Sequence, residues 1–209
     1  MGRRAGAVGE QTRSDLMEAA VRVFSARGYE GSRVSEIAAE AGLSTGAIYA
    51  HYDNKTELLC DAIRAGGPKA IRRLIDAGSC GSALDLLRAM GSRLAGAVST
   101  QAGNAKAARA ILIESLAASR REPQVAEVLR SSLAEREAMF AALVQRGQDA
   151  GEIAPGVSVK AIARLCMLLL LGSIVARTIE LPPVPADEWG AVVAGMVALL
   201  EPATDAVAP

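Results

Sequence analysis

The segment RVSEIAAEAGLSTGAIYAHY at residues 33–52 restricts the fold of this chain more than any other stretch. Ala38 is small enough to lie where two helices approach closely. Gly42, four residues later, permits the positive φ of a tight turn at no steric cost. Ile48, six residues further on, can fill the space between the two helices. This spacing predicts a helix-turn-helix.

Helical patterns dominate the rest of the chain. Apolar residues make up 51% of the sequence and aromatic residues only 3%, a composition that favours helices. One apolar face predicts a first helix at about residues 11–27, ended by Gly28. No stretch alternates like a strand. We therefore expect an all-α fold of about nine helices, with three short or medium helices in the N-terminal unit, one from Asn54, and others at about 82–101, 104–120, 123–150, 157–180 and 186–201.

Glycine and proline interrupt the helix that follows the motif. Gly66, Gly67 and Pro68 should break or kink it, and we expect residues 66–68 to act as a hinge. We divide the chain into a domain at 1–55, whose residues 1–10 form a flexible arm, and a second domain at 56–209.

The third helix, which is the second helix of the helix-turn-helix, ends in Tyr-x-His-Tyr-x-x-Lys. This ending makes the motif specific. Phe24 and Gly28-Tyr29 close the first helix, Ile37 to Ser44 reads Ile-Ala-x-x-Ala-Gly-Leu-Ser, and Gly46 to Lys55 completes the pattern. Residues of about 12–60 resemble the N-terminal domain of TetR/AcrR-type transcriptional regulators. The resemblance implies a helix-turn-helix DNA-binding domain and a C-terminal helical domain that binds a ligand and dimerises.

The resemblance also implies roles for individual residues. We expect Ser32, which suits the N-cap of the second helix, to touch a phosphate as well. The base-facing and backbone-binding groups lie in the third helix and beside it. Base edges would be met by Thr45, Gly46, Ala47 and Ala50, and the DNA backbone by Tyr49, His51, Lys55 and the helix start at Ser44, with help from Arg33.

Charge argues against strong non-specific binding to DNA. Residues 1–55 carry seven basic and seven acidic groups, and the whole chain is also neutral. The base-facing set contains no Arg, Asn or Gln, so we expect specificity to come from half-site spacing and DNA shape. An alternative function is a small-molecule-binding helical protein with weak or lost DNA binding.

The sequence gives no support for enzyme activity, a cofactor or a metal site. His51 is the sole histidine, and Tyr49 and His51 point apart on a helix. A plain surface histidine is the other reading of this residue. Cys60, Cys80 and Cys166 have no metal-ligand spacing, and they suggest a reducing, cytoplasmic compartment. We expect no enzyme activity, no cofactor and no metal site.

The C-terminal domain carries less information. Its longest apolar run, at residues 165–176, is too short to span a bilayer, so we expect no membrane partner. Helices at 157–180 and 186–201 would pair with a second copy, although an internal core helix of a monomer also fits. We expect a repressor on a palindromic operator, released by a small hydrophobic effector, with activation left open. Candidate effector contacts are Met90, Arg93, Ile113, Glu114 and Phe140.

Overall fold

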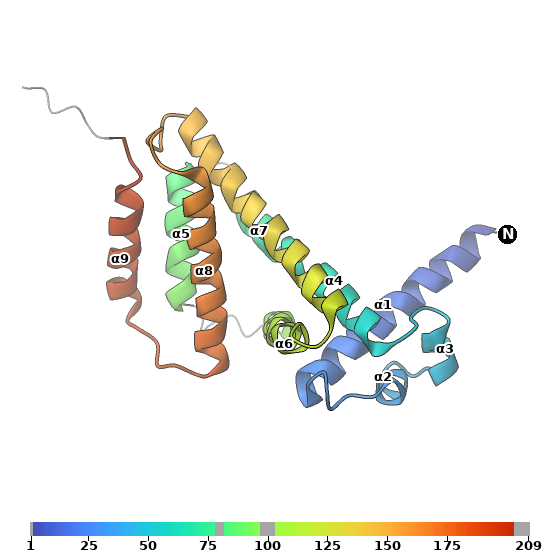
Figure 1. Cartoon of the computed structure of the whole chain (residues 1–209). Coiled ribbons are helices and arrows are strands. Elements are labelled where there is room, and N and C mark those ends of the chain that lie inside the picture. Colours follow the sequence, from blue (N-terminus) through green and yellow to red (C-terminus); the bar gives the residue numbers. More distant parts are fainter. Residues whose placement is uncertain (1, 78–81, 97–102, 203–209) are drawn as a thin grey trace, which may run out of the picture. The chain divides into compact units, whose positions relative to one another are not determined.

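The computed structural model describes residues 2–77, 82–96 and 103–202, and all regular structure within these ranges is α-helical (Figure 1). This confirms the predicted all-α fold with about nine helices. The helices in chain order are α1 (Gly2–Arg27), α2 (Val34–Glu40), α3 (Thr45–Tyr49), α4 (Lys55–Ala77), α5 (Ala83–Gly96), α6 (Gly103–Ala118), α7 (Pro123–Asp149), α8 (Val159–Thr178) and α9 (Ala186–Ala198).

The chain forms two compact units. The first contains residues 1–67 and 102–132, and the second contains residues 68–101 and 133–209. This grouping differs from the predicted division after residue 55, because α6 packs against α1 within the first unit. Both α4 and α7 run from one unit into the other.

The core of the first unit is built on the apolar face of α1. Residues at helical spacing along this face are all buried, as the periodicity predicts. Gly28 ends the helix with a φ of 74°, which a residue without a Cβ adopts at no cost. The Tyr29 ring then packs on Phe24 with ring centroids 5.7 Å apart. The buried face consists of Leu16, Ala19, Ala20, Val23 and Phe24.

The start of α1 differs from the prediction. The helix begins at Gly2, so the residues expected to form a flexible arm continue α1 instead. Extending a helix that already exists costs far less than starting a new one. No proline stands between Gly2 and Gln11 to prevent that extension.

Residues 66–68 do not break α4, because the helix is continuous from Lys55 to Ala77; a kink at these residues stays a prediction. Pro68 removes one hydrogen-bond donor and two glycines precede it, but helix-forming residues beyond them continue the helix in both directions. The boundary between the two compact units nevertheless falls between Gly67 and Pro68. The hinge at 66–68 stays a prediction.

In the second unit, α5 and α9 pack very closely. A Cβ at Gly91 would lie 2.6 Å from a methyl carbon of Val193, so only glycine permits this approach. The indole Nε1 of Trp189 donates to the Gly91 carbonyl at 2.9 Å. The surrounding core combines α5, α7 and α9 through Leu84, Leu86, Leu87, Leu143, Val144, Ile153, Val193 and Val197.

Helix α8 leaves much of its apolar surface uncovered in the single chain. Ala163 and Met167 are buried on one side, against Phe140 of α7. Leu165, Leu168 and Val175 are exposed. The helix is 20 residues long with a mean hydropathy of 2.0, which by length and composition alone would suffice to cross a membrane. A core helix of a soluble protein passes the same test.

Candidate nucleic-acid interface

The helix-turn-helix forms as the sequence predicts. Gly42 adopts a φ of 69°, and the Leu43 amide donates to the Ala38 carbonyl at 2.9 Å, which closes the turn between α2 and α3. Ile37, Ala38 and Ile48 are buried together with the rest of the small core. The turn therefore fixes how α3 is presented.

Helix α3 has one buried and one exposed side. Ser44 is its N-cap, and the Ser44 hydroxyl accepts a hydrogen bond from the Ala47 amide at 3.3 Å. Ile48 and, just beyond the helix, Tyr52 are buried, whereas the Tyr49 side chain is 56% exposed. Ala47 and His51 are partly exposed. The predicted contacts of this segment that are exposed are Ser44, Thr45, Gly46, Tyr49 and Ala50.

Ser32 is not the N-cap of α2, and its contact with a phosphate stays a prediction. The N-cap of α2 is Arg33, whose amide donates to the Glu36 carboxylate at 3.0 Å. Ser32 is only 3% exposed, and its hydroxyl donates to the Gly28 carbonyl. Glu36, three residues after Arg33, accepts the hydrogen bond of the Arg33 amide. Ser32 therefore does not cap α2 and forms its hydrogen bond within the turn. Arg33 is exposed, as a DNA contact requires.

Lys55 also differs from its predicted role as a phosphate contact. Its ammonium group donates to the carbonyls of Tyr29 at 2.9 Å, Ser32 at 3.3 Å and Glu30 at 3.4 Å. It lies 4.4 Å from the centroid of the Tyr29 ring. An ammonium group has three hydrogens to donate, and protein carbonyls accept all of them. Lys55 therefore braces the turn between α1 and α2.

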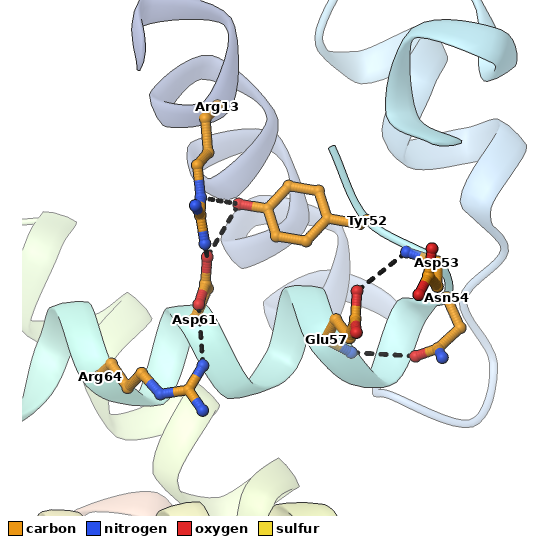
Figure 2. Close-up of polar contacts among 7 residues, drawn as sticks. All are labelled: Arg13, Tyr52, Asp53, Asn54, Glu57, Asp61 and Arg64. Atoms are coloured by element: carbon orange, nitrogen blue, oxygen red, sulfur yellow. Dashed lines mark hydrogen bonds and ion pairs between the residues drawn. The ribbon is translucent and has the colours of Figure 1, made fainter. Parts of the chain in front are cut away.

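Figure 2 shows a polar cluster that the sequence did not predict, joining α1, the end of the motif and α4. Asp61 accepts hydrogen bonds from the Tyr52 hydroxyl at 3.1 Å, from Arg64 at 3.0 Å and from both the Nε (3.1 Å) and the Nη2 of Arg13. Arg13 also donates to the Tyr52 hydroxyl at 3.3 Å. Tyr52 is buried as predicted, but its hydroxyl has a role of its own.

The electrostatics of this cluster favour an ionised Asp61. Burial alone raises the pKa of the Asp61 carboxyl, but hydrogen bonds from Arg13, Arg64 and Tyr52 outweigh burial and hold that pKa below its ordinary value. Burial also raises the pKa of Tyr52, against the opposing effect of Arg13. The cluster thus stabilises a neutral phenol between two charged groups.

Ion pairs occupy many of the charged side chains of the first unit. Arg22 pairs with Glu40, Arg27 with Glu36 and Arg121 with Glu30, besides Arg13 with Asp61. Within the part of the chain that the structure describes, Arg33 forms no ion pair. Arg33 is thus an exposed cation at the start of α2.

The start of α4, which follows the motif directly, is well capped. The Asp53 amide donates to the Glu57 carboxylate at 2.8 Å, and the Glu57 amide donates to the Asn54 side chain at 3.0 Å (Figure 2). The amides of Asp53 and Glu57, which have no partner within the helix, both find an acceptor. Local hydrogen bonds therefore hold the connection between α3 and α4.

The candidate effector contacts are divided between the two units. Met90 and Phe140 belong to the apolar clusters of the second unit, and Arg93 is exposed. Ile113 is partly buried in the first unit. Glu114 lines a hollow of about 350 Å³ with Tyr29, Glu30 and Arg121. A second open hollow, of about 470 Å³, lies between α7 and α8 and includes Ala138, Ala141 and Arg164.

Comparisons with known proteins identify the family. Residues 16–62 match the family of bacterial regulatory proteins of the tetR family, and residues 80–194 match the tetracyclin repressor-like C-terminal domain. The second match covers more than half of the chain. The chain belongs to the TetR family and is a transcriptional regulator.

Individual relatives support the same family. The regulator TtgR of Pseudomonas putida is 42% identical over 59 residues, which span 28% of each protein. UidR of Escherichia coli K12 is 24% identical over 163 residues, covering 78% of this chain and 80% of UidR. A TetR-family regulator from Cytophaga hutchinsonii has the same fold, with a TM-score of 0.74 at 17% identity, covering 92% of this chain and 96% of that one.

Proposed function

We propose that this regulator is a homodimeric, ligand-responsive repressor that acts in the cytoplasm. It binds a palindromic operator through α2 and α3 and is released by a small hydrophobic effector. TetR-family regulators bind DNA and small-molecule effectors and are typically dimeric, which supports this proposal. Effector binding would shift the population toward a spacing of the two DNA-binding units that no longer fits successive major grooves.

The observation that carries the proposal is the division of α3 into two faces. Ile48 and Tyr52 anchor the segment in the core, which leaves Thr45, Gly46 and Tyr49 exposed together. Small residues at the start of the helix allow its backbone to approach base edges closely, and the Tyr49 hydroxyl is a suitable phosphate donor. A second helix presented in this way is what the major groove accepts.

Dimerisation is supported by the apolar surface of α8 and α9. Gly172, Gly190 and Gly195 have open space where a Cβ would stand, so the backbone of another helix could approach there. Leu168 and Val192 are exposed on the same two helices. A second copy of the chain that covers these helices would remove that apolar surface from water.

The test is fluorescence anisotropy with the DNA that flanks the protein's own gene, measured over a range of salt concentrations. Tyr49→Ala should weaken binding to all sequences by roughly fivefold, because one phosphate hydrogen bond is lost. Arg33→Ala should lower the salt slope by about one. Arg93→Ala, which removes an equally exposed arginine in the second unit, is the matched control. If both variants bind like the parent, the interface is assigned wrongly.

The second candidate function is a small-molecule-binding helical protein with weak or lost DNA binding. It is favoured by Lys55, whose three donors are occupied by protein carbonyls. The base-facing residues of α3 also lack bidentate hydrogen-bonding side chains. A parent protein that shifts no flanking fragment in a gel, even at low salt, would favour this function over the first.

A further inference from the structure

The turn at residues 28–32, between α1 and α2, is held by side chains from distant parts of the chain. The Tyr29 amide donates to the carboxylate of Glu114 in α6 at 2.7 Å. The Tyr29 carbonyl accepts from the ammonium of Lys55, the first residue of α4, at 2.9 Å. A carboxylate therefore binds the amide of Tyr29, and an ammonium group binds its carbonyl. Hydrogen bonds to charged groups are about twice as strong as those between neutral groups.

The side chain of Tyr29 is fixed as firmly as its backbone. Its ring is only 2% exposed and packs between Phe24 and the Lys55 ammonium. Its hydroxyl lies 2.9 Å from the Thr56 hydroxyl on α4. A shift of the Tyr29 backbone would therefore disturb both Lys55 and the packing at the start of α4.

Helix α6 contacts this turn at more than one point. A Cβ at Gly28 would stand 3.2 Å from the Glu114 carboxylate, and Arg121, just after α6, pairs with Glu30 at 3.1 Å. The turn is thus held to α6 at Tyr29 and at Glu30. A movement of α6 cannot leave the turn unchanged unless these contacts break.

The start of α4 is in turn connected to α3 by a short, hydrogen-bonded segment. The amides of His51 and Tyr52 donate to the Ile48 carbonyl, both at 2.8 Å, and α4 begins at Lys55. Lys55 also contacts the Ser32 carbonyl directly before α2. Through Tyr29 and Lys55, the carboxylate of Glu114 is therefore connected to the start of α4 and to the residue Ser32 shortly before α2.

We propose that Glu114 is a positioning residue for DNA binding, through which α6 sets the placement of α2 and α3. Glu114 holds the Tyr29 amide. Lys55 is the first residue of α4 and holds the Tyr29 carbonyl, so it couples the position of the turn to the position of α4. This inference rests on the proposed function, since it concerns how the DNA-binding motif is held. It also gives Lys55 and Glu114 roles different from phosphate and effector contact.

The test measures the affinity of the full chain for the DNA flanking its gene, at a temperature where circular dichroism shows every variant fully folded. Glu114→Ala should weaken binding about tenfold, because the charge-assisted hydrogen bond to Tyr29 is lost. Glu114→Gln keeps an acceptor oxygen and should restore most of the affinity. Glu127→Ala removes an exposed carboxylate of the same unit and controls for the change in net charge.

A double-mutant cycle with Lys55→Met tests the path through the turn. If Glu114 acts through Lys55, Glu114→Ala should weaken binding less than about threefold in the Lys55→Met background. Fully additive effects, or an unchanged affinity of Glu114→Ala, would overturn the inference while the parent still binds DNA. A parent that binds no DNA would overturn the proposed function and this inference together, and exchange of the Tyr29 amide would still report the Glu114 contact.

Discussion

The two compact units differ most in how much apolar surface they leave in water. Among the described residues, the exposed large apolar side chains number two in the first unit, Tyr49 and Leu116, and nine in the second. All nine lie between Leu165 and Leu199, on α8, α9 and their connection. The first unit is therefore complete as a single chain, and its exposed aromatic ring belongs to the candidate DNA interface. In the second unit, the proposed dimer would cover the exposed apolar surface of α8 and α9.

The units also differ in how distant segments are joined. In the first, charged side chains hold backbone groups and phenols across long sequence separations, as Glu114, Lys55 and Asp61 do. In the second, α5 is joined to α9 by close apolar packing of Gly91 against Val193 and by a hydrogen bond from the Trp189 indole to the Gly91 carbonyl. Polar contacts fix one geometry because their partners and angles are specific, whereas apolar faces accept any complementary surface.

The largest effect is expected from the core of the first unit. Phe24→Ala should lower the free energy of unfolding by about 3–5 kcal/mol, since the ring is fully buried and packs on Tyr29. Leu116→Ala, on the exposed side of α6, should cost about 1 kcal/mol or less. Urea denaturation followed by circular dichroism measures both. Similar losses for the two variants would contradict the view that this unit is complete on its own.

The apolar face of the second unit gives the next largest effect. Leu168→Glu places a charge where a partner helix is expected, and should weaken dimerisation by about 100-fold, or roughly 2.7 kcal/mol. Leu116→Glu, a matched change in the first unit, should leave the dimer intact. Sedimentation velocity over a range of concentrations measures both. A monomeric parent would refute the proposed dimer, and a parent that floats with lipid vesicles would assign α8 to a membrane.

Local patterns in the sequence predicted most of the fold. The apolar face of α1, the left-handed Gly28 and Gly42, and the burial of Ile48 and Tyr52 all follow from spacing within one or two helical turns. The extension of α1 and the continuity of α4 did not follow; in α4, glycine and proline were taken as stops. Their neighbours continued each helix at low cost.

The roles of Lys55, Asp61 and Glu114 could not be predicted in the same way. Lys55 lies 26 residues from Tyr29 and Glu114 lies 85 residues from it, so no helical period links them. Such contacts depend on how helices pack, which a single sequence does not encode locally. A lysine at the first position of α4 gives the same sequence pattern whether its ammonium group binds a phosphate or three backbone carbonyls.

A smaller effect is expected from the Arg13–Asp61–Tyr52 cluster, and it should depend on pH. Because the folded-state pKa of Asp61 lies below its unfolded value of about 3.9, its contribution to stability is present above that pH and is lost as the pH falls through the folded pKa. Asp61→Asn should cost about 1–2 kcal/mol at pH 7, from the weakened charge-assisted hydrogen bonds.

Urea denaturation from pH 7 down to pH 2 measures this difference. The curves of the parent and of Asp61→Asn should converge as the Asp61 carboxylate becomes protonated. Glu127→Gln, at an exposed carboxylate, should follow the parent at every pH. Parallel curves for the parent and Asp61→Asn over the whole range would show that the carboxylate charge does not stabilise the cluster.

The smallest expected effect has the opposite sign and concerns Arg136 of α7 in the second unit. Its Nε is buried without a hydrogen-bond partner among the described residues, and burial lowers its pKa against the opposing charge of Glu135. Arg136→Met keeps the apolar stem and removes the desolvated charge, so it should raise the free energy of unfolding by about 1 kcal/mol. Arg146→Met, on an exposed part of the same helix, should change it by about 0.5 kcal/mol or less. Urea denaturation decides between two explanations of the unpartnered Nε of Arg136. Stabilisation by Arg136→Met would show that the buried charge destabilises the unit. Destabilisation would show that an acceptor outside the single chain pairs with Arg136 in the proposed dimer.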